Sequence, residues 1–157
     1  MLQHGTAKTI YNYQNLTNMK HFTINEFEKS AKACQLGIDN TIPSAQKKNI
    51  EKLVNLVLDP LREVLKAPII ISSGYRCPRL NRAVGGAIDS QHVDGLAADI
   101  TFQKRDTYCY WAYCLLKSPN HPYRQHIDQC IYYEKRGFIH VSISVDDKPR
   151  GQFWIQA

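Results

Sequence analysis

The clearest hydrophobic pattern follows Ser44, where apolar residues recur every three or four positions. This spacing places them on one face of a helix. The stripe consists of Ile50, Leu53, Val54, Val57, Leu58, Leu61, Val64 and Leu65. Pro60 interrupts the run, and because proline lacks the amide hydrogen that a helix interior requires, we expect a kink there. The pattern therefore predicts a long, kinked helix whose apolar stripe packs into the core.

A shorter helical signal precedes this stripe. Thr23 and Glu26 have the spacing of a capping box at a helix N-terminus, and Gly37 suits the C-terminal stop. Phe22, just before the cap, can pack on Phe27. We predict one helix between these two ends.

Strand patterns dominate the chain after Pro68. Ile69–Ser72 is a short apolar run, and Ala97–Phe102 alternates so that Ala97, Asp99 and Thr101 share one face. A helix is predicted from Asp106 to Leu116, followed by two strands, Ile127–Glu134 and Phe138–Val145. This order predicts an α+β fold with N-terminal helices packed on a small, mostly antiparallel sheet.

Length and composition indicate one domain. The chain has 157 residues, of which 43% are hydrophobic and 22% charged, which are values typical of a globular protein. No apolar run approaches the roughly 20 residues of a membrane-spanning helix, and the first residues lack the apolar core of a secretory signal. We predict a poorly ordered leader at residues 1–20 and a single domain at 21–157.

The net charge indicates the kind of partner, and the cysteine content indicates the redox state of the protein. A net charge of +6 favours an anionic partner such as nucleic acid, a membrane surface or bacterial wall polymer. The basic residues are dispersed rather than striped, which argues against nucleic acid. Five cysteines without a CxxC pair indicate a reduced protein rather than a disulfide framework. We expect a monomer.

Two histidines and one aspartate stand out as candidate metal ligands. His92, Asp99 and His140 provide two imidazoles and a carboxylate, the set that holds a zinc ion with one open coordination position. Strand alternation places Asp99 and His140 each on the polar face of its strand. Asp99 can also be an ordinary hydrogen-bonded carboxylate, but an unpaired buried charge is costly, which favours a cation partner.

A hydrolytic zinc site also needs a base, and the last hairpin offers Glu134. If residues 135–137 form a three-residue loop, Tyr132 lies opposite His140 and Glu134 shares their face. A two-residue loop would instead turn Glu134 to the opposite face. Glu134 as a solvated hairpin acid is the alternative interpretation, and His126 is then the second candidate base.

Three polar residues near His92 are candidate substrate contacts. Arg76 follows the first predicted strand, where its guanidinium can bind a carboxylate or brace its own turn. Ser90 and Gln91, directly before His92, can hydrogen-bond peptide carbonyls.

Three segments together resemble the zinc D-Ala-D-Ala carboxypeptidase-like peptidases of the M15 family. They are SGYRCPRLNRAVGG at 73–86, Ser90-x-His92-x-x-Gly95-x-Ala97-x-Asp99, and IHVS at 139–142. Members of this family cut bacterial cell-wall peptides and include phage endolysins. The resemblance runs from about residue 21 to 144. It implies that His92, Asp99 and His140 bind zinc and that Arg76 and Ser90 contact substrate.

The position of the candidate base differs from the pattern of the M15 family. Several members carry an acid three residues before the last histidine, where this chain has Gly137. Residues 132–140 resemble instead the zinc domain of hedgehog signalling proteins, in which a glutamate six residues before the final histidine faces the metal. That likeness implies Glu134 as the base.

These observations predict a zinc metallopeptidase that hydrolyses peptidoglycan stem peptides, as a D-Ala-D-Ala carboxypeptidase or an endolysin-type endopeptidase. The alternative is a zinc-stabilised, hedgehog-like binding module without turnover. Without a signal peptide, the protein is expected to stay in the cytoplasm until released to the wall, as in phage lysis, or exported by another route.

Overall fold

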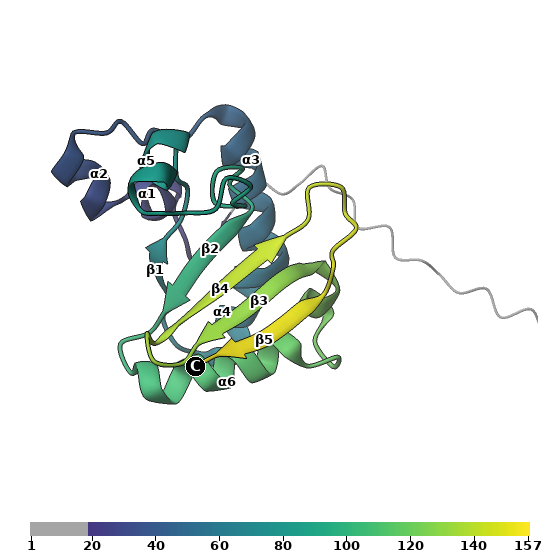
Figure 1. Ribbon diagram of the computed structural model, residues 1–157. Helices are drawn as coiled ribbons and strands as arrows, with labels where there is room; N and C mark the ends of the chain where they lie inside the picture. Colours follow the sequence, from purple (N-terminus) through teal and green to yellow (C-terminus); the bar gives the residue numbers. More distant parts are fainter. Residues whose placement is uncertain (1–18) are drawn as a thin grey trace, which may run out of the picture.

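The computed structural model describes residues 19–157, and the fold is α+β, as predicted (Figure 1). The predicted leader falls outside the described residues except for its last two positions. Lys20 is tied to the fold, since its backbone N–H donates to Asp59 Oδ2 at 2.7 Å. The helices α3, α4 and α6 pack against one face of a five-stranded sheet.

The sheet has the strand order β1-β2-β4-β3-β5. The strands are β1 Ile70–Ser73, β2 Ala97–Thr101, β3 Ile127–Tyr133, β4 Phe138–Ile143 and β5 Gln152–Gln156. All neighbours are antiparallel except β3 and β5, which are parallel. The mostly antiparallel sheet is thus confirmed, but the sequence analysis missed β5. Its signal was the run of aromatic and β-branched residues at 153–155.

The helical elements fill the intervals between these strands. They are α1 Ile24–Glu28, α2 Ala31–Leu36, α3 Ser44–Leu53, the π-helical turn η2 Val54–Leu58, α4 Asp59–Leu65, α5 Pro78–Ala83, α6 Arg105–Lys117 and the 3-10 helix η3 Pro122–His126. Within residues 19–157, none of these combines the length and apolar character needed to cross a bilayer.

The single N-terminal helix that we predicted is in fact two. Both predicted ends are correct: the Glu26 carboxylate accepts from the Thr23 N–H at 2.9 Å, and Gly37 stops α2 with φ +60°. Ser30 breaks the segment because its hydroxyl accepts from the Ala33 N–H at 3.1 Å and starts α2 as an N-cap.

The interruption expected at Pro60 takes the form of the π-helical turn η2. The Asp59 N–H donates to the Val54 carbonyl, five residues back, just before the proline that has no N–H to offer. The apolar stripe is buried as predicted, with one correction. Val64 is 40% exposed, because the stripe is too wide for the core to cover entirely.

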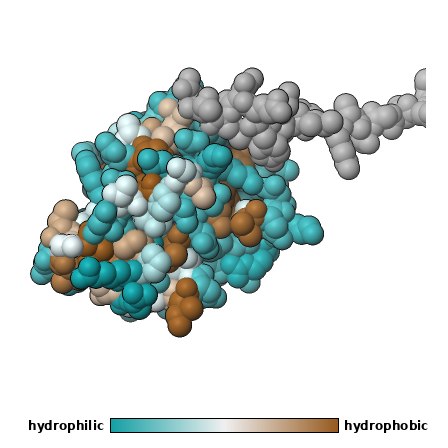
Figure 2. Space-filling model, turned by 90° about the horizontal axis from the view of Figure 1, so that it is seen from above, coloured by the Kyte–Doolittle hydropathy of each residue, from teal (hydrophilic) through white to brown (hydrophobic). Residues whose placement is uncertain are grey.

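Strands β2 and β4 have one apolar and one polar face. Ala98, Ile100 and Phe102 on one segment and Ile139, Val141 and Ile143 on the other belong to the core. The intervening residues therefore face away from the helices, as the alternation predicted. Seen from above, the surface mixes broad hydrophilic areas with smaller hydrophobic patches (Figure 2).

Candidate metal centre

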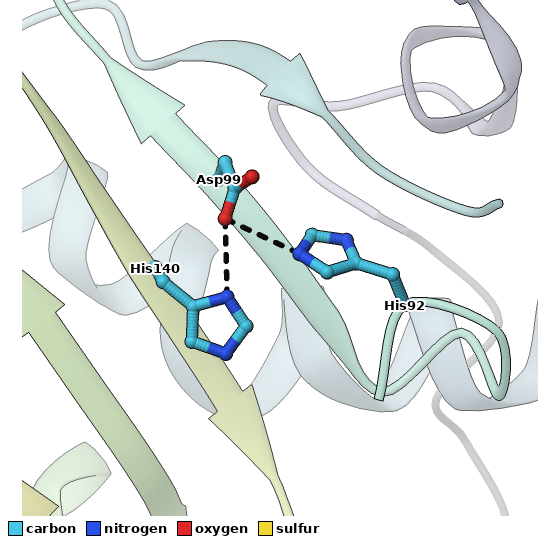
Figure 3. A group of neighbouring side chains, drawn as sticks. All are labelled: His92, Asp99 and His140. Atoms are coloured by element: carbon cyan, nitrogen blue, oxygen red, sulfur yellow. Dashed lines mark hydrogen bonds and ion pairs between the residues drawn. The ribbon is translucent and has the colours of Figure 1, made fainter. Parts of the chain in front are cut away.

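The side chains of His92, Asp99 and His140 meet on the polar face of the sheet (Figure 3). His92 Nε2 and His140 Nδ1 lie 3.2 and 3.1 Å from the same oxygen, Asp99 Oδ1. The two imidazole rings are 5.1 Å apart between centroids. One potential donor atom from each residue lies within 4.8 Å of the other two.

Two of these residues are placed by the sheet itself. Asp99 on β2 and His140 on β4 are direct cross-strand partners, so the antiparallel ladder sets their separation. His92 comes instead from the loop before β2. Turn hydrogen bonds, from the Gly95 N–H to the His92 carbonyl and from the Leu96 N–H to the Gln91 carbonyl, fold this loop back over the strand.

The orientation of His92 depends on Gly74. His92 Nδ1 lies 2.7 Å from the Gly74 carbonyl oxygen, which can only accept, so Nδ1 carries a proton. A metal therefore binds His92 through Nε2, after any proton on that nitrogen has left. Gly74 also packs against the backbone of Phe27. A Cβ at position 74 would lie 2.5 Å from the Phe27 Cα, so only glycine allows this close approach.

The donor set fits a zinc ion. Zinc binds imidazole nitrogen and carboxylate oxygen at about 2.0–2.2 Å, and tetrahedral geometry then separates two donors by about 3.3 Å. The observed distances of 3.1 and 3.2 Å agree with this value. The nitrogen that His92 directs away from Asp99 has its own carbonyl partner, as metal-bound histidines usually do.

Asp99 is buried yet ionised. Burial alone raises the pKa of its carboxyl group, but hydrogen bonds and charges from His140 and His92 outweigh burial and bring the pKa below its ordinary value. Its second oxygen, Oδ2, accepts from Arg76 Nη2 at 3.1 Å. A deprotonated carboxylate is the form that a metal requires.

Arg76 braces the site from inside. Its Nε donates to Ser73 Oγ at 3.1 Å, in addition to the bond with Asp99. Both partners are side chains, and neither is a backbone carbonyl of its own turn. Arg76 also lines a cavity of about 340 Å³ together with Asp99, so it remains available to a ligand there.

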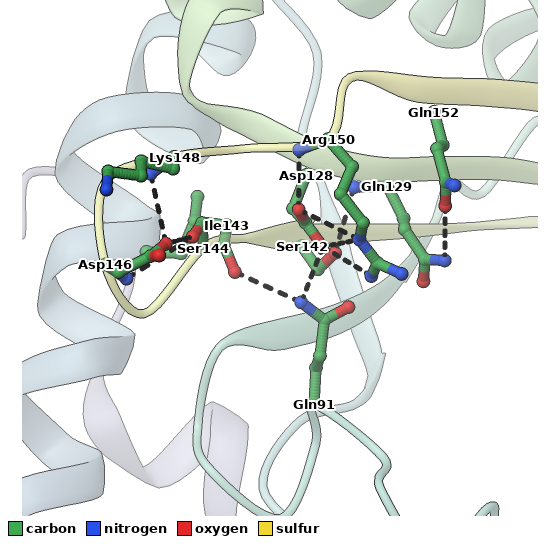
Figure 4. Close-up of polar contacts among 10 residues, drawn as sticks. All are labelled: Gln91, Asp128, Gln129, Ser142, Ile143, Ser144, Asp146, Lys148, Arg150 and Gln152. Carbon is green, nitrogen blue, oxygen red and sulfur yellow. Dashed lines mark hydrogen bonds and ion pairs between the residues drawn. The ribbon is translucent and has the colours of Figure 1, made fainter.

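Ser90 and Gln91, the other two predicted substrate contacts, lie on the His140 side of the ligand set. Both line a second cavity of about 310 Å³ next to His140. Gln91 Nε2, however, donates to Asp128 Oδ2 at 2.9 Å and to the Ile143 carbonyl at 3.2 Å (Figure 4). Its amide hydrogens are thus used to hold the His92 loop against the sheet.

Asp128, near the start of β3, is the buried residue that anchors Gln91. Arg150 donates to both carboxylate oxygens of Asp128: its Nη2 lies 2.6 Å from Oδ2, and its backbone N–H donates to Oδ1 at 2.7 Å (Figure 4). Burial raises the pKa of Asp128, but the Arg150 and Gln91 hydrogen bonds outweigh it, and the net shift is downward. No local pattern reveals this pair, because its members are 22 residues apart.

The predicted hairpin register is wrong. Tyr133 pairs with Phe138 and Ile131 pairs with His140, so the turn has four residues, 134–137, rather than three. Tyr132 turns into the core, where its ring lies 6.0 Å from that of Tyr113 on α6. This large ring gains more from burial than from the polar face, which explains the register.

Glu134 consequently begins the turn rather than ending the strand. It is exposed, and its N–H donates to the Gln156 carbonyl of β5 at 2.9 Å. The hairpin argument for Glu134 as base fails, and its support is the resemblance to hedgehog alone.

The second candidate base, His126, lies in η3. It lines a separate cavity of about 180 Å³ with Lys52 and Asp147. It is not among the residues that line the two cavities beside the ligand set. Burial lowers its pKa.

Comparisons with known proteins identify the family of the chain. Curated proteins give no match. A family match to Peptidase M15 covers residues 20–142, a span that contains all three ligand candidates and ends just after His140. Because this match covers most of the 157 residues, the chain belongs to the M15 peptidase family.

Proposed function

We propose that this M15 peptidase depends on zinc and hydrolyses peptide bonds in the stem peptides of bacterial peptidoglycan. The observation that carries the proposal is the meeting of His92, Asp99 and His140 at zinc-binding distances. A zinc ion held there supplies a Lewis acid and a source of hydroxide at neutral pH.

The chain's own residues prepare this centre in three ways. The Gly74 carbonyl holds His92 in the tautomer that can bind metal. Arg76 orients Asp99 by binding its outer oxygen. Cavities lie on both sides of the ligand set, one lined by Asp99 and the other by His140, so a peptide can extend across it.

Two carboxylates are candidates for the proton-transferring base. Glu134 is supported by the hedgehog resemblance. Asp89 is supported by position, because it lines the same cavity as His140 and Ser90. A base must come within hydrogen-bond reach of the proton that it takes. Glu134→Gln and Asp89→Asn variants with unchanged zinc content identify the base as the one whose kcat falls by about 10²–10⁴.

A non-catalytic, hedgehog-like binding module is the second candidate. The observation that favours it is the exposed position of Glu134 in the turn. Such a module would bind zinc stoichiometrically, and neither Glu134→Gln nor Asp89→Asn would change its behaviour toward peptides.

Mass spectrometry of muropeptides tests the proposal directly. Purified protein with bound zinc should release new amines and shortened stem peptides, and a chelator should stop the release. Loss of a terminal D-Ala identifies a carboxypeptidase, whereas internal cleavage identifies an endolysin-type endopeptidase. Tightly bound zinc without any cleavage would contradict the proposal and leave the binding module.

A further inference from the structure

The cavity on the Asp99 side of the ligand set is basic. Three arginines line it, Arg76, Arg105 and Arg136, against one acid, Asp99. The remaining lining residues carry no charge: Ser72, Ser73, Thr101, Gly137 and Phe138. A positively charged cavity of this kind attracts anions.

Only one of the three arginines is neutralised within the cavity. Arg76 pairs with Asp99 Oδ2, while Oδ1 of the same carboxylate faces the two histidines. Within residues 19–157, neither Arg105 nor Arg136 forms an ion pair. Both are exposed, so their guanidinium groups are open to a ligand.

Aromatic stacking holds Arg136 in place. Its guanidinium carbon lies 4.8 Å from the centroid of the Phe138 ring and 5.7 Å from that of Tyr133. These two rings stack on each other at 4.5 Å. Cation–π contacts of this type restrict the side chain before a ligand arrives, which lowers the entropy cost of binding.

Arg105 is positioned beside the same turn. It begins α6, and a Cβ at Gly137 would lie 3.0 Å from its Cδ, so the glycine leaves room for the arginine stem. A hydrogen bond ties the turn to β2, because the Gly137 carbonyl accepts from Thr101 Oγ1 at 2.7 Å. The two arginines thus come from segments that meet beside Gly137, Arg105 from the start of α6 and Arg136 from the β3–β4 turn.

We propose that Arg105 and Arg136 form a subsite for a carboxylate of the peptide substrate, next to the metal ligands. The inference rests on the proposed function and names the chemistry that the enzyme selects, an acidic peptide rather than a neutral one. Guanidinium groups suit this role because they bind carboxylates through paired, charge-assisted hydrogen bonds.

The test compares two pentapeptides, L-Ala-D-Glu-L-Lys-D-Ala-D-Ala and the same peptide with its carboxylates converted to carboxamides. Each is titrated into the ¹⁵N-labelled, zinc-loaded full chain. Protein amide shifts report binding, and the peptide signals in the same sample report hydrolysis. We expect the acidic peptide to bind about tenfold more tightly than the amide.

Substitution then assigns the preference to the arginines. In the Arg105→Gln/Arg136→Gln double variant, the ratio of the affinities for the acidic and the amidated peptide should fall to about 1–2. The Arg105→Lys/Arg136→Lys variant should keep part of the preference for the acidic peptide, because both positive charges remain. Arg79→Gln, which removes an exposed arginine from α5 outside the cavity, is the matched control and should keep the full ratio.

The possible failures are distinguishable. A wild-type protein that binds both peptides equally, or neither, overturns the subsite, as does an unchanged ratio in the double Gln variant. A protein that prefers the acidic peptide but never hydrolyses it contradicts the proposed function and leaves the subsite intact.

Discussion

The ligand candidates come from two regions that the fold stabilises differently. Asp99 and His140 are neighbours in a sheet whose other face is packed on helices. His92 sits on a loop that is held by polar contacts with Gly74 and, through Gln91, with Asp128. The two candidates on strands are therefore fixed by backbone pairing and core burial, while the candidate on the loop depends on a few hydrogen bonds to distant residues.

The largest expected effect is the loss of a strand ligand. Asp99→Ala removes the carboxylate between the two imidazoles. Zinc affinity should fall by well over the roughly hundredfold loss that follows removal of a residue that only hydrogen-bonds to a metal ligand. The backbone ladder does not use this side chain, so circular dichroism should remain unchanged. Metal analysis after dialysis measures the loss, and stoichiometric zinc in the variant would exclude Asp99 as a ligand.

The next effect tests the support beneath the loop ligand. Gly74→Ala forces a methyl group against the Phe27 backbone and should lower the free energy of unfolding by about 3 kcal/mol. Zinc affinity should fall as well, because the 74 carbonyl orients His92. Urea denaturation measures the stability change.

Gly37→Ala is the control for this substitution. It adds a methyl group where no atom lies within 4 Å, so only the cost of its positive φ remains, about 1 kcal/mol. Equal losses in the two variants would mean that the packing at Gly74 is unimportant.

A smaller effect is expected at the anchor of the loop. Asp128→Asn weakens the contacts with Arg150 and Gln91 and should cost about 1–2 kcal/mol at neutral pH. The folded-state pKa of Asp128 lies below its ordinary value of 3.8, so the ionised group stabilises the fold above that pH. The advantage of wild type over Asp128→Asn should therefore be widest at neutral pH and shrink as the pH falls below about 4.

Urea denaturation at pH 7 and at pH 3 checks this prediction. A difference that stays constant between the two values would show that the ionisation of Asp128 contributes nothing to folding.

The smallest effect concerns Gln91. Gln91→Ala removes two hydrogen bonds from the loop and should cost about 1 kcal/mol, with a few-fold decrease in zinc affinity. Gln129→Ala, which loses only an exposed contact with Gln152, should change stability by less than about 0.5 kcal/mol. If Gln91 instead bound substrate and did not support the loop, KM would rise without any change in stability or metal content.

The sequence predicted best those features that depend on short-range periodicity. The apolar alternation along residues 97–102 and 138–143 correctly assigned Asp99 and His140 to the polar face. The helical stripe after Ser44 and the stop at Gly37 were also confirmed, because each depends on residues a few positions apart.

Three features escaped the sequence analysis. The Asp128–Arg150 pair joins residues that no motif connects, and β5 pairs in parallel with a strand that precedes it by about twenty positions. The hairpin register was wrong because Tyr132 packs against α6, which a turn pattern cannot reveal.

The sequence by itself determined which residues can bind a metal and the family to which the chain belongs, since donor chemistry and motif spacing are local properties. Tertiary structure alone decided which carboxylates lie near the ligand set and how the loop bearing His92 is held. It also brought Arg105 and Arg136 to one cavity. Contacts between distant segments fix these features, and their energies are set by packing that no short stretch of sequence contains.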